Sequence, residues 1–264
     1  MRWTINNWHS ALDIAYSIPY TIFIKTRQPL TLTLRPHQQR ALDALLTASI
    51  GRVTIPTGGG KTLVMIEDVK RRLTASTTPQ TIVVVAPRIL LAVQLYEEFW
   101  SALNGTVDVA AMHVHSGEVD CYSSTKVQQI QCHAGVCAAA GIHQLIFTTY
   151  NSLRRVNEAG IDVDMIYYDE AHNSVRRDFF KEVAIASITA TYAYYFSATP
   201  KYRGSDIIMN NTTVYGSELI SVPAPELINN GSIIPPTIQP HVVDIERNKS
   251  LLAAENDREV LIDI

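Results

Sequence analysis

The sequence predicts an α/β fold in which one doubly wound, mainly parallel sheet is covered by helices on both faces. Two observations predict it. Short apolar runs alternate with longer amphipathic runs along most of the 264 residues, and several short runs are apolar throughout. Strands of a parallel sheet have this composition because both of their faces are covered. With 47% hydrophobic and 18% charged residues, the chain has a globular composition, which excludes disordered and collagen-like classes.

Six short apolar segments are predicted to be strands. They are rich in the β-branched and aromatic residues that favour strands. In chain order they are residues 52–55, 81–86, 107–114, 144–148, 165–168 and 192–196.

Three of the intervening segments carry clear signals for helices. Pro36 is suited to the first turn of one helix, because its missing N–H has no partner there in any case. A second helix is predicted to begin at Lys61. A third is predicted over residues 88–103, where large apolar residues recur at helical spacing.

The chain after Pro200 has a different composition. Glycine, proline and asparagine are frequent there, which argues against further strand–helix–strand units. We expect residues 216–245 to be a connector and Lys249 to open an amphipathic helix. Because the sequence ends within that amphipathic pattern, we expect the chain to be a piece of a longer protein.

Charge and cysteine content limit the classes of function. The net charge is −3, so no general affinity for polyanions is indicated. Residues 1–100 contain 11 basic and 6 acidic side chains, whereas residues 101–264 contain 11 and 19, so a nucleic acid would be bound by a local surface. Three cysteines cannot form a disulfide framework, which favours a reducing compartment. We predict neither a signal peptide nor a membrane span, and expect a cytoplasmic protein or a viral one acting in its host's cytosol.

The most informative stretch is VTIPTGGGKT, which joins the first predicted strand to the helix beginning at Lys61. Successive glycines allow backbone N–H groups to surround phosphate oxygens, and the helix N-terminus adds positive potential. The lysine supplies a point charge, and the hydroxyl of Thr62 is suited to Mg²⁺. The segment therefore predicts a nucleoside triphosphate site, although Ile55 stands where the general G-x-x-x-x-G-K-[ST] pattern has glycine. The residues expected to hold the nucleotide are Thr57, Gly58, Gly59, Gly60, Lys61 and Thr62.

Polar residues follow several of the other predicted strands. Asp169 and Glu170 come directly after residues 165–168, at the strand end where an open parallel sheet binds its ligand. In a nucleotide hydrolase one carboxylate holds Mg²⁺ and another orients the attacking water. Ser197 and Thr199 follow the last strand, and Arg88 follows residues 81–86. Each of these is unremarkable alone, since Ser and Thr commonly cap helices.

Taken in order, these segments resemble the motifs of superfamily-two helicases and translocases, the DEAD/DEAH-box group in the broad sense. The matching segments are LRPHQ (34–38), PTGGGKT (56–62), APRILLAVQ (86–94), TTYNSL (148–153), DEAH (169–172) and SAT (197–199). The resemblance implies a P-loop NTPase with a RecA-like motor domain over residues 31–215, which hydrolyses ATP. It also implies an N-terminal accessory segment over residues 1–30, and a connector and the start of a second RecA-like domain over residues 216–264.

The resemblance also implies residue roles. Gln38 would contact adenine, with Gln39 as a weaker candidate, and Lys61 would bind the β- and γ-phosphates. Thr62 and Asp169 would hold Mg²⁺, and Glu170 would activate water. The residues implied to couple the nucleotide site to nucleic acid are His172, Ser197 and Thr199. The residues expected to contact nucleic acid are Pro87, Arg88, Gln94, Thr149, Arg154 and Arg155.

The form of these motifs is closer to DNA translocases and restriction motors than to DEAD-box RNA helicases, so DNA is favoured over RNA. An RNA helicase domain remains an alternative. A truncated regulator that binds nucleotide without productive hydrolysis is another, because no counterpart of the second motor domain and its arginine finger is present before Ile264.

Two further features favour structural interpretations. Cys121, Cys132 and Cys137 lie near several histidines, but their spacing is poor for zinc, and we expect loosely packed or buried thiols. The tyrosines within the predicted strands are expected to pack in the core instead of stacking on bases.

Overall fold

The computed structural model describes residues 33–119, 121–203 and 207–235. Its described residues up to Ile233 belong to one compact unit. The predicted accessory segment 1–30 and the predicted helix from Lys249 lie outside the described residues.

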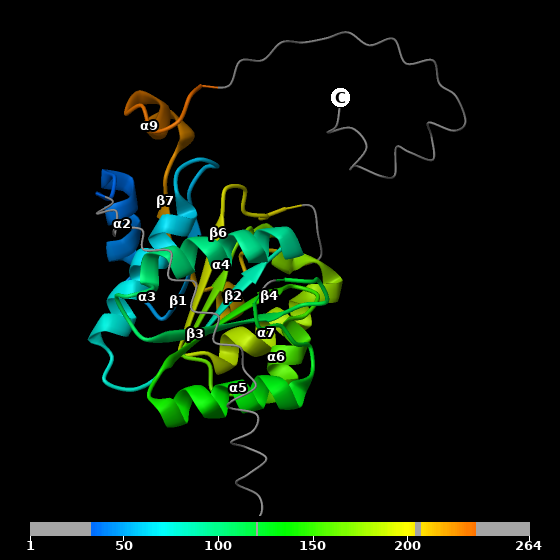
Figure 1. Ribbon diagram of the computed structural model, residues 1–264. Helices are drawn as coiled ribbons and strands as arrows, with labels where there is room; N and C mark the ends of the chain where they lie inside the picture. Colours follow the sequence, from blue (N-terminus) through cyan, green and yellow to red (C-terminus); the bar gives the residue numbers. More distant parts are fainter. Residues whose placement is uncertain (1–32, 120, 204–206, 236–264) are drawn as a thin grey trace, which may run out of the picture. The chain divides into compact units, whose positions relative to one another are not determined.

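The described residues form one parallel sheet (Figure 1). Its strand order is β3-β4-β2-β5-β6-β1-β7, and every neighbouring pair is parallel. The strands are β1 (Ile50–Thr54), β2 (Thr81–Ala86), β3 (Val109–Val114), β4 (His143–Thr149), β5 (Met165–Tyr168), β6 (Tyr192–Ser197) and β7 (Ser217–Ser221). The first six are the predicted strands, with ends shifted by a few residues at most.

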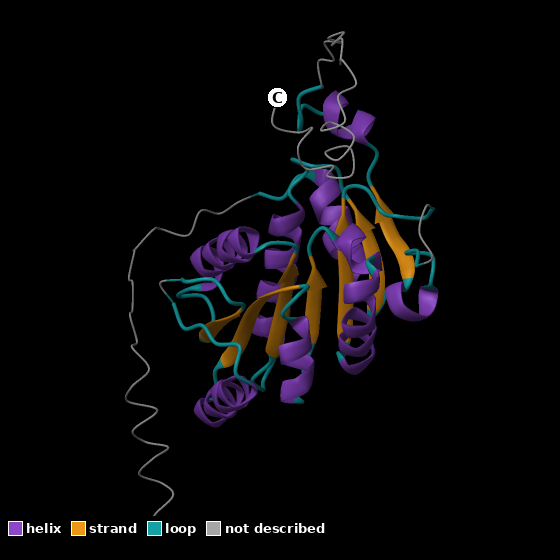
Figure 2. Ribbon diagram, turned by 90° about the vertical axis from the view of Figure 1, so that its right-hand side faces the viewer, coloured by secondary structure: helices purple, strands orange, loops and turns teal. Residues whose placement is uncertain are grey.

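Helices cover both faces of this sheet (Figure 2). They are α2 (Pro36–Leu45), α3 (Lys61–Ala75), α4 (Ile89–Leu103), α5 (Val127–Ala140), α6 (Leu153–Ala159), α7 (Arg177–Thr189), α8 (Thr212–Tyr215) and α9 (Ala224–Asn229), with a 3₁₀ turn η2 at Ala171–Val175. The three predicted helices are confirmed, since α2 begins at Pro36, α3 begins at Lys61 and α4 follows Arg88 as its N-cap.

Strand β2 explains why the apolar runs are continuous. Ile82 and Val84 belong to the core cluster that contains residues of α2, α3 and α4. Val83 and Val85 belong to the cluster on the other face, with residues of α5, α6 and α7. Because successive side chains point to opposite faces and both faces are covered, residues 82–86 are all apolar, and only Thr81 at the start of the strand is polar.

The tyrosines of β5 and β6 are core residues, as predicted. Tyr167, Tyr168, Tyr194 and Tyr195 are fully buried, and Tyr168 stacks on Tyr195 with ring centroids 4.6 Å apart. Each of their hydroxyls makes a hydrogen bond within the protein, so none is buried without a hydrogen-bond partner.

A buried ion pair connects α3 to the sheet. The carboxylate of Asp68 is fully buried, and it accepts hydrogen bonds from Arg72 Nε at 3.0 Å and from the Tyr167 hydroxyl at 2.7 Å. Arg72 also donates to the Tyr194 hydroxyl at 2.8 Å. The helix that follows the glycine loop is thus fixed to both β5 and β6.

One expectation for the less regular part of the chain is wrong. Residues 217–221 were expected in a connector, but they form β7, which pairs with β1 at the edge of the sheet. The preceding breaker, Gly216, marks the entry to this strand: its φ is +62°, and a Cβ there would lie 2.4 Å from the carbonyl oxygen of Ile50.

Parallel pairing brings the carboxyl ends of all strands to one edge, and their order places the polar segments side by side. Along that edge, Thr149 ends β4, Pro87 and Arg88 follow β2, and Asp169 follows β5. Next come Ser197, which ends β6, and the glycine loop after β1. The sheet therefore puts the acidic pair between the segments predicted to bind nucleic acid and those predicted to bind nucleotide.

Candidate nucleotide site

The glycine loop connects β1 to α3 in the backbone conformation that its sequence requires. Gly58 and Gly60 have φ values of +78° and +82°, and Gly60 is the N-cap of α3. Left-handed backbone at these positions is open to glycine at little cost. The loop therefore leads directly into a helix N-terminus, whose free N–H groups and dipole favour an anion.

The carbonyl oxygen of Gly59 is held from α2. It accepts hydrogen bonds from His37 Nε2 at 2.8 Å and from Gln38 Nε2 at 3.1 Å, and both side chains are buried. Gln38 Oε1 also accepts a bond from the Arg35 backbone N–H at 2.8 Å. Gln38 thus fixes both the start of α2 and the glycine loop, while Gln39 is exposed and donates to Asp43. The role of His37 was not predicted.

The glycine loop also packs against the segment that follows β7. Leu227 of α9 is fully buried, and a Cβ on Gly59 would lie 3.0 Å from its Cδ1. A Cβ on Gly58 would lie 3.3 Å from Cγ2 of Ile233. Arg40 of α2 forms an ion pair with Glu226 of α9. The contacts of Leu227 and Ile233 thus join the glycine loop to residues that the sequence analysis expected in a connector.

The lysine of the loop faces the acidic pair. Lys61 Nζ lies 3.4 Å from Glu170 Oε1, and the lysine is only 9% exposed. Asp169 is 9% exposed, and its backbone N–H donates to the Val85 carbonyl at 2.8 Å, which fixes it to β2. Thr62, the next residue of α3, is half-buried. Sequence reasoning predicted that these residues share one site, and the Lys61–Glu170 contact confirms that the loop and the acidic pair meet.

Glu170 occupies an unusual backbone conformation. Its φ and ψ are 44° and 53°, and no other non-glycine residue among those described has a positive φ. Such a conformation costs about 1–3 kcal/mol and is retained only where surrounding contacts hold it. Asn173 provides two of these contacts, because its backbone N–H and its side-chain Nδ2 both donate to the Glu170 carbonyl, at 3.0 and 2.9 Å.

His172 connects Glu170 to Ser197. Its Nδ1 lies 3.4 Å from Glu170 Oε2 and 3.1 Å from Ser197 Oγ. Asn173 Nδ2 lies 3.3 Å from His172 Nε2, so in the neutral ring Nε2 accepts and Nδ1 carries the proton. Ser197 Oγ in turn accepts the backbone N–H of Thr199 at 3.1 Å. The predicted coupling residues therefore form one hydrogen-bonded chain from Glu170 to Thr199.

The two carboxyl groups have opposite pKa shifts. Burial, and then the neighbouring Glu170 charge, raise the pKa of Asp169 to about 6. The hydrogen bond from His172 is the main cause that lowers the pKa of Glu170, and Lys61 contributes in the same direction. Glu170 is therefore ionised at neutral pH. Ionisation of Asp169 is unfavourable because the charged carboxylate is buried.

The residues predicted to contact nucleic acid differ in exposure. Arg88 and Gln94 are exposed, and Gln94 donates to Glu98. Thr149 is 4% exposed, so its side chain offers almost no surface. Arg154 and Arg155 on α6 are exposed and both pair with Glu158, at 3.2 and 3.0 Å.

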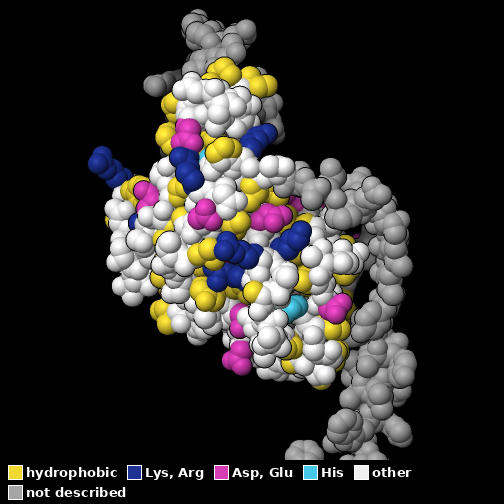
Figure 3. Space-filling view, turned by 90° about the vertical axis from the view of Figure 1, so that its left-hand side faces the viewer, with side chains coloured by type: hydrophobic (Ala, Val, Ile, Leu, Met, Phe, Trp, Pro, Cys, Tyr) yellow, Lys and Arg dark blue, Asp and Glu magenta, His cyan; other side chains and the backbone are white. Residues whose placement is uncertain are grey.

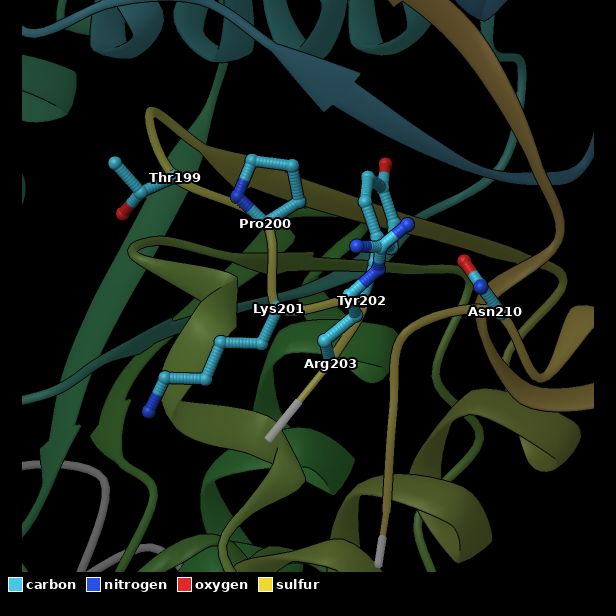
Figure 4. Close-up of a pocket in the computed structure, with 6 residues that line it drawn as sticks. All are labelled: Thr199, Pro200, Lys201, Tyr202, Arg203 and Asn210. Atoms are coloured by element: carbon cyan, nitrogen blue, oxygen red, sulfur yellow. The ribbon is translucent and has the colours of Figure 1, made fainter. Parts of the chain in front are cut away.

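An open hollow of about 740 Å³ lies beyond β6 (Figure 4). It is lined by Thr199, Pro200, Lys201, Tyr202, Arg203 and Asn210. Sequence reasoning identified Thr199 but none of the others. Figure 4 shows the Lys201 side chain directed away from the side chains of Tyr202 and Arg203.

The remaining surface and metal predictions concern smaller features. On the side of α2 and α3, basic and acidic side chains are interspersed and no large field of one sign forms (Figure 3). Within the described ranges, no three His, Cys, Asp or Glu side chains are grouped as metal ligands. Cys137 is buried, Cys121 is half-buried and Cys132 is exposed. None of the described helices has both the length and the apolar character needed to cross a bilayer.

Comparison with known proteins identifies the family. The family model described as Type III restriction enzyme, res subunit, matches residues 31–202, well over half of the chain. The chain belongs to this family. A search of curated proteins finds no significant match.

Solved structures show the same fold for this Type III res-family chain. A nuclease-deletion mutant of the Type ISP restriction-modification enzyme LlaGI, in complex with a DNA substrate mimic, is 20% identical with a TM-score of 0.67, covering 76% of this chain and 21% of LlaGI. The Type ISP enzyme LlaBIII bound to DNA is 18% identical with a TM-score of 0.63, covering 76% of this chain and 16% of LlaBIII. The UvsW helicase from bacteriophage T4 is 14% identical with a TM-score of 0.52, covering 71% of this chain and 60% of UvsW.

Together, the family match, the parallel sheet and the shared fold support the resemblance of this chain to the first RecA-like domain of superfamily-two enzymes. The chain spans only about a fifth of the Type ISP enzymes that it resembles.

Proposed function

We propose that this res-family chain is the ATP-binding half of a DNA translocase or helicase, which hydrolyses ATP to move along nucleic acid. The observation that carries the proposal is the Lys61 Nζ to Glu170 Oε1 contact of 3.4 Å, which joins the N-terminus of α3 to the turn that follows β5. Phosphoryl transfer to water uses a lysine that binds the phosphates and a group that orients the attacking water, and this contact brings two groups suited to those roles together.

In this proposal, the chain's own groups hold the triphosphate and the water. Backbone N–H groups of the glycine loop and Lys61 bind the β- and γ-phosphates, so Lys61 exchanges its Glu170 partner for phosphate. Glu170 then orients a water molecule and accepts its proton while the oxygen attacks the γ-phosphorus and the bond to the β-phosphate oxygen breaks. His172 holds the second oxygen of Glu170, which fixes the direction of the carboxylate.

The residues present are suited to Mg²⁺. Asp169 supplies a carboxylate, and Thr62 supplies a hydroxyl beside the glycine loop, which is the oxygen-rich ligand set that this ion prefers. When bound, Mg²⁺ would neutralise charge that develops on the phosphate oxygens. The raised pKa of Asp169 fits this assignment, because a bound cation compensates for the burial of the carboxylate.

The nucleotide part of the proposal is tested with ATP binding and turnover. We expect the 264-residue chain to bind ATP with Mg²⁺ weakly and to hydrolyse it barely, because arginine fingers from a second domain contribute about 10³–10⁵ in rate. Lys61→Ala should abolish binding, and Glu170→Gln should keep binding but slow hydrolysis further. Turnover that is unchanged in Glu170→Gln would refute the assigned role of Glu170.

For the nucleic acid, we propose DNA in preference to RNA, held along the carboxyl ends of β4 and β2. The position of Pro87, Arg88 and Thr149 next to Asp169 along the sheet edge supports this surface. Because Thr149 is buried, Pro87 and Arg88 provide most of the accessible surface there. Stimulation of ATP turnover in the complete motor by duplex DNA, single-stranded DNA and RNA, compared side by side, distinguishes these partners.

The basic side chains of α6 provide a separate test. Arg154 and Arg155 share one carboxylate, Glu158, so together they leave one positive charge for a phosphate. Replacing both with Gln should weaken binding of all sequences and lower the salt dependence of the affinity. An unchanged slope of affinity against salt would show that α6 lies away from the nucleic acid.

A further inference from the structure

Tyr150 is a buried residue that the proposed mechanism does not use. It directly follows β4 and is 2% exposed, although its sequence neighbour Asn151 is exposed. Its ring is stacked between Tyr168, at 6.2 Å, and Phe179, at 5.6 Å. The ring is therefore held in one position by the core beneath the carboxyl edge of the sheet.

The polar groups of Tyr150 reach two neighbouring strand ends. Its hydroxyl donates to the backbone carbonyl of Asp169 at 2.9 Å, just after β5. Its backbone N–H donates to the carbonyl of Ala86, the last residue of β2, at 3.2 Å. Tyr150 thus connects the ends of β4, β2 and β5 in one residue.

The Asp169 carbonyl belongs to a turn that needs support. The next residue, Glu170, has its left-handed backbone conformation, and the peptide between the two residues sets the directions of both carboxylates. Asn173 holds this turn from the Glu170 side, through two hydrogen bonds to the Glu170 carbonyl. The Tyr150 hydroxyl holds it from the Asp169 side.

We propose that Tyr150 is a positioning residue for the metal-binding carboxylate: its hydroxyl fixes the Asp169–Glu170 turn so that Asp169 is oriented toward Mg²⁺. This inference rests on the proposed function, because it assumes that Asp169 holds Mg²⁺ with ATP. Groups that orient a metal ligand through a hydrogen bond commonly change metal affinity by about 10–100-fold when removed.

The chain offers a matched control for the loss of this hydroxyl. Tyr168 is also fully buried, lies in the same core cluster and stacks on Tyr150. Its hydroxyl bonds to Ser187 Oγ at 2.9 Å and to the Val183 carbonyl at 3.2 Å, both on α7. Tyr168→Phe therefore removes a buried hydroxyl without touching the Asp169–Glu170 turn.

The experiment measures binding of a fluorescent, nonhydrolysable ATP analogue to the 264-residue chain, in EDTA and over a titration of Mg²⁺. We expect Tyr150→Phe to bind the analogue in EDTA with the same affinity as the wild type. The increase in affinity on adding Mg²⁺ should be about tenfold smaller in Tyr150→Phe than in the wild type. Tyr168→Phe should retain both. The inference is overturned if Tyr150→Phe retains the full gain, if it weakens binding equally with and without Mg²⁺, or if Tyr168→Phe loses the gain as well.

A second measurement separates failure of this inference from failure of the proposed function. If the wild-type chain binds no analogue in either condition, the proposed nucleotide site is refuted. Hydrogen–deuterium exchange of peptides covering residues 169–175 then decides the positioning role, since Tyr150→Phe should speed exchange there and Tyr168→Phe should not. Equal exchange in the two variants overturns the role. Thermal melts check that both variants fold.

Discussion

Replacing Asp169 with Asn should stabilise the protein at neutral pH. The pKa of Asp169 rises from 3.8 to about 6, chiefly through burial and then through Glu170. Since one pKa unit corresponds to about 1.4 kcal/mol, ionising this carboxyl costs the folded state about 3 kcal/mol. The cost is absent below about pH 4, where the carboxyl is protonated in both states, and complete above about pH 6. Asn carries no charge, so Asp169→Asn avoids it.

Thermal unfolding at pH 4 and pH 8, without nucleotide, measures this effect. For a domain of this size, about 3 kcal/mol corresponds to roughly 6–12 °C in Tm at pH 8, and the difference should vanish at pH 4. The exposed Asp162 precedes the same strand, and Asp162→Asn should leave Tm within about 2 °C at both values. The reasoning is refuted if Asp169→Asn is no more stable than the wild type at pH 8, or if it is stabilised equally at pH 4 and pH 8.

Two further predictions concern stability, and denaturant unfolding checks both. Arg72→Met should lower the free energy of unfolding by about 3–5 kcal/mol, because it leaves the buried Asp68 carboxylate without its partner. Arg71→Met, at the exposed neighbouring position, should lower it by less than about 1 kcal/mol. Equal effects of the two substitutions would contradict the importance of the buried ion pair. Gly60→Ala should destabilise the protein by about 1–2 kcal/mol, because the backbone at Gly60 has a φ of +82°. Gly135→Ala, in helix α5 with open space around it, should stabilise the protein by about 0.5–1 kcal/mol. A Gly60→Ala variant that is more stable than the wild type would contradict the assigned loop conformation.

The sheet and the meeting of the motifs were predictable because both follow from local patterns and one topological rule. Apolar runs such as residues 81–86 predict buried parallel strands, and parallel strands present their carboxyl ends at one edge. Once Asp169 and Lys61 are placed after such strands, they are expected at the same edge of the sheet, and the strand order β5-β6-β1 found in the structure brings them close together.

Strand β7 was missed because its pattern is weak. SELIS is short, has exposed residues at both ends, and lies among prolines and glycines that usually mark loops. An edge strand needs only one neighbour and has little apolar surface to bury, so the register with β1 is set by tertiary packing that a single sequence does not reveal.

The contacts made by individual side chains were also beyond the sequence. The motif TTYNSL was identified, but nothing in it indicates that Thr149 is buried or that the Tyr150 hydroxyl reaches Asp169. Gln38 was predicted to contact adenine, which stays a prediction, while its bond to the Gly59 carbonyl is a finding of the structure. Such contacts join segments far apart in the chain, and only the fold brings them together.

Leu227 and Ile233 contact the glycine loop, and this links the loop to the end of the domain. The compact unit ends at Ile233, and that same residue touches the bend in which Gly58 lies. A substitution that moves this bend would therefore also displace the Ile233 side chain that packs against it. Ile233 thus links the conformation of the glycine loop to the residues at which the compact unit ends.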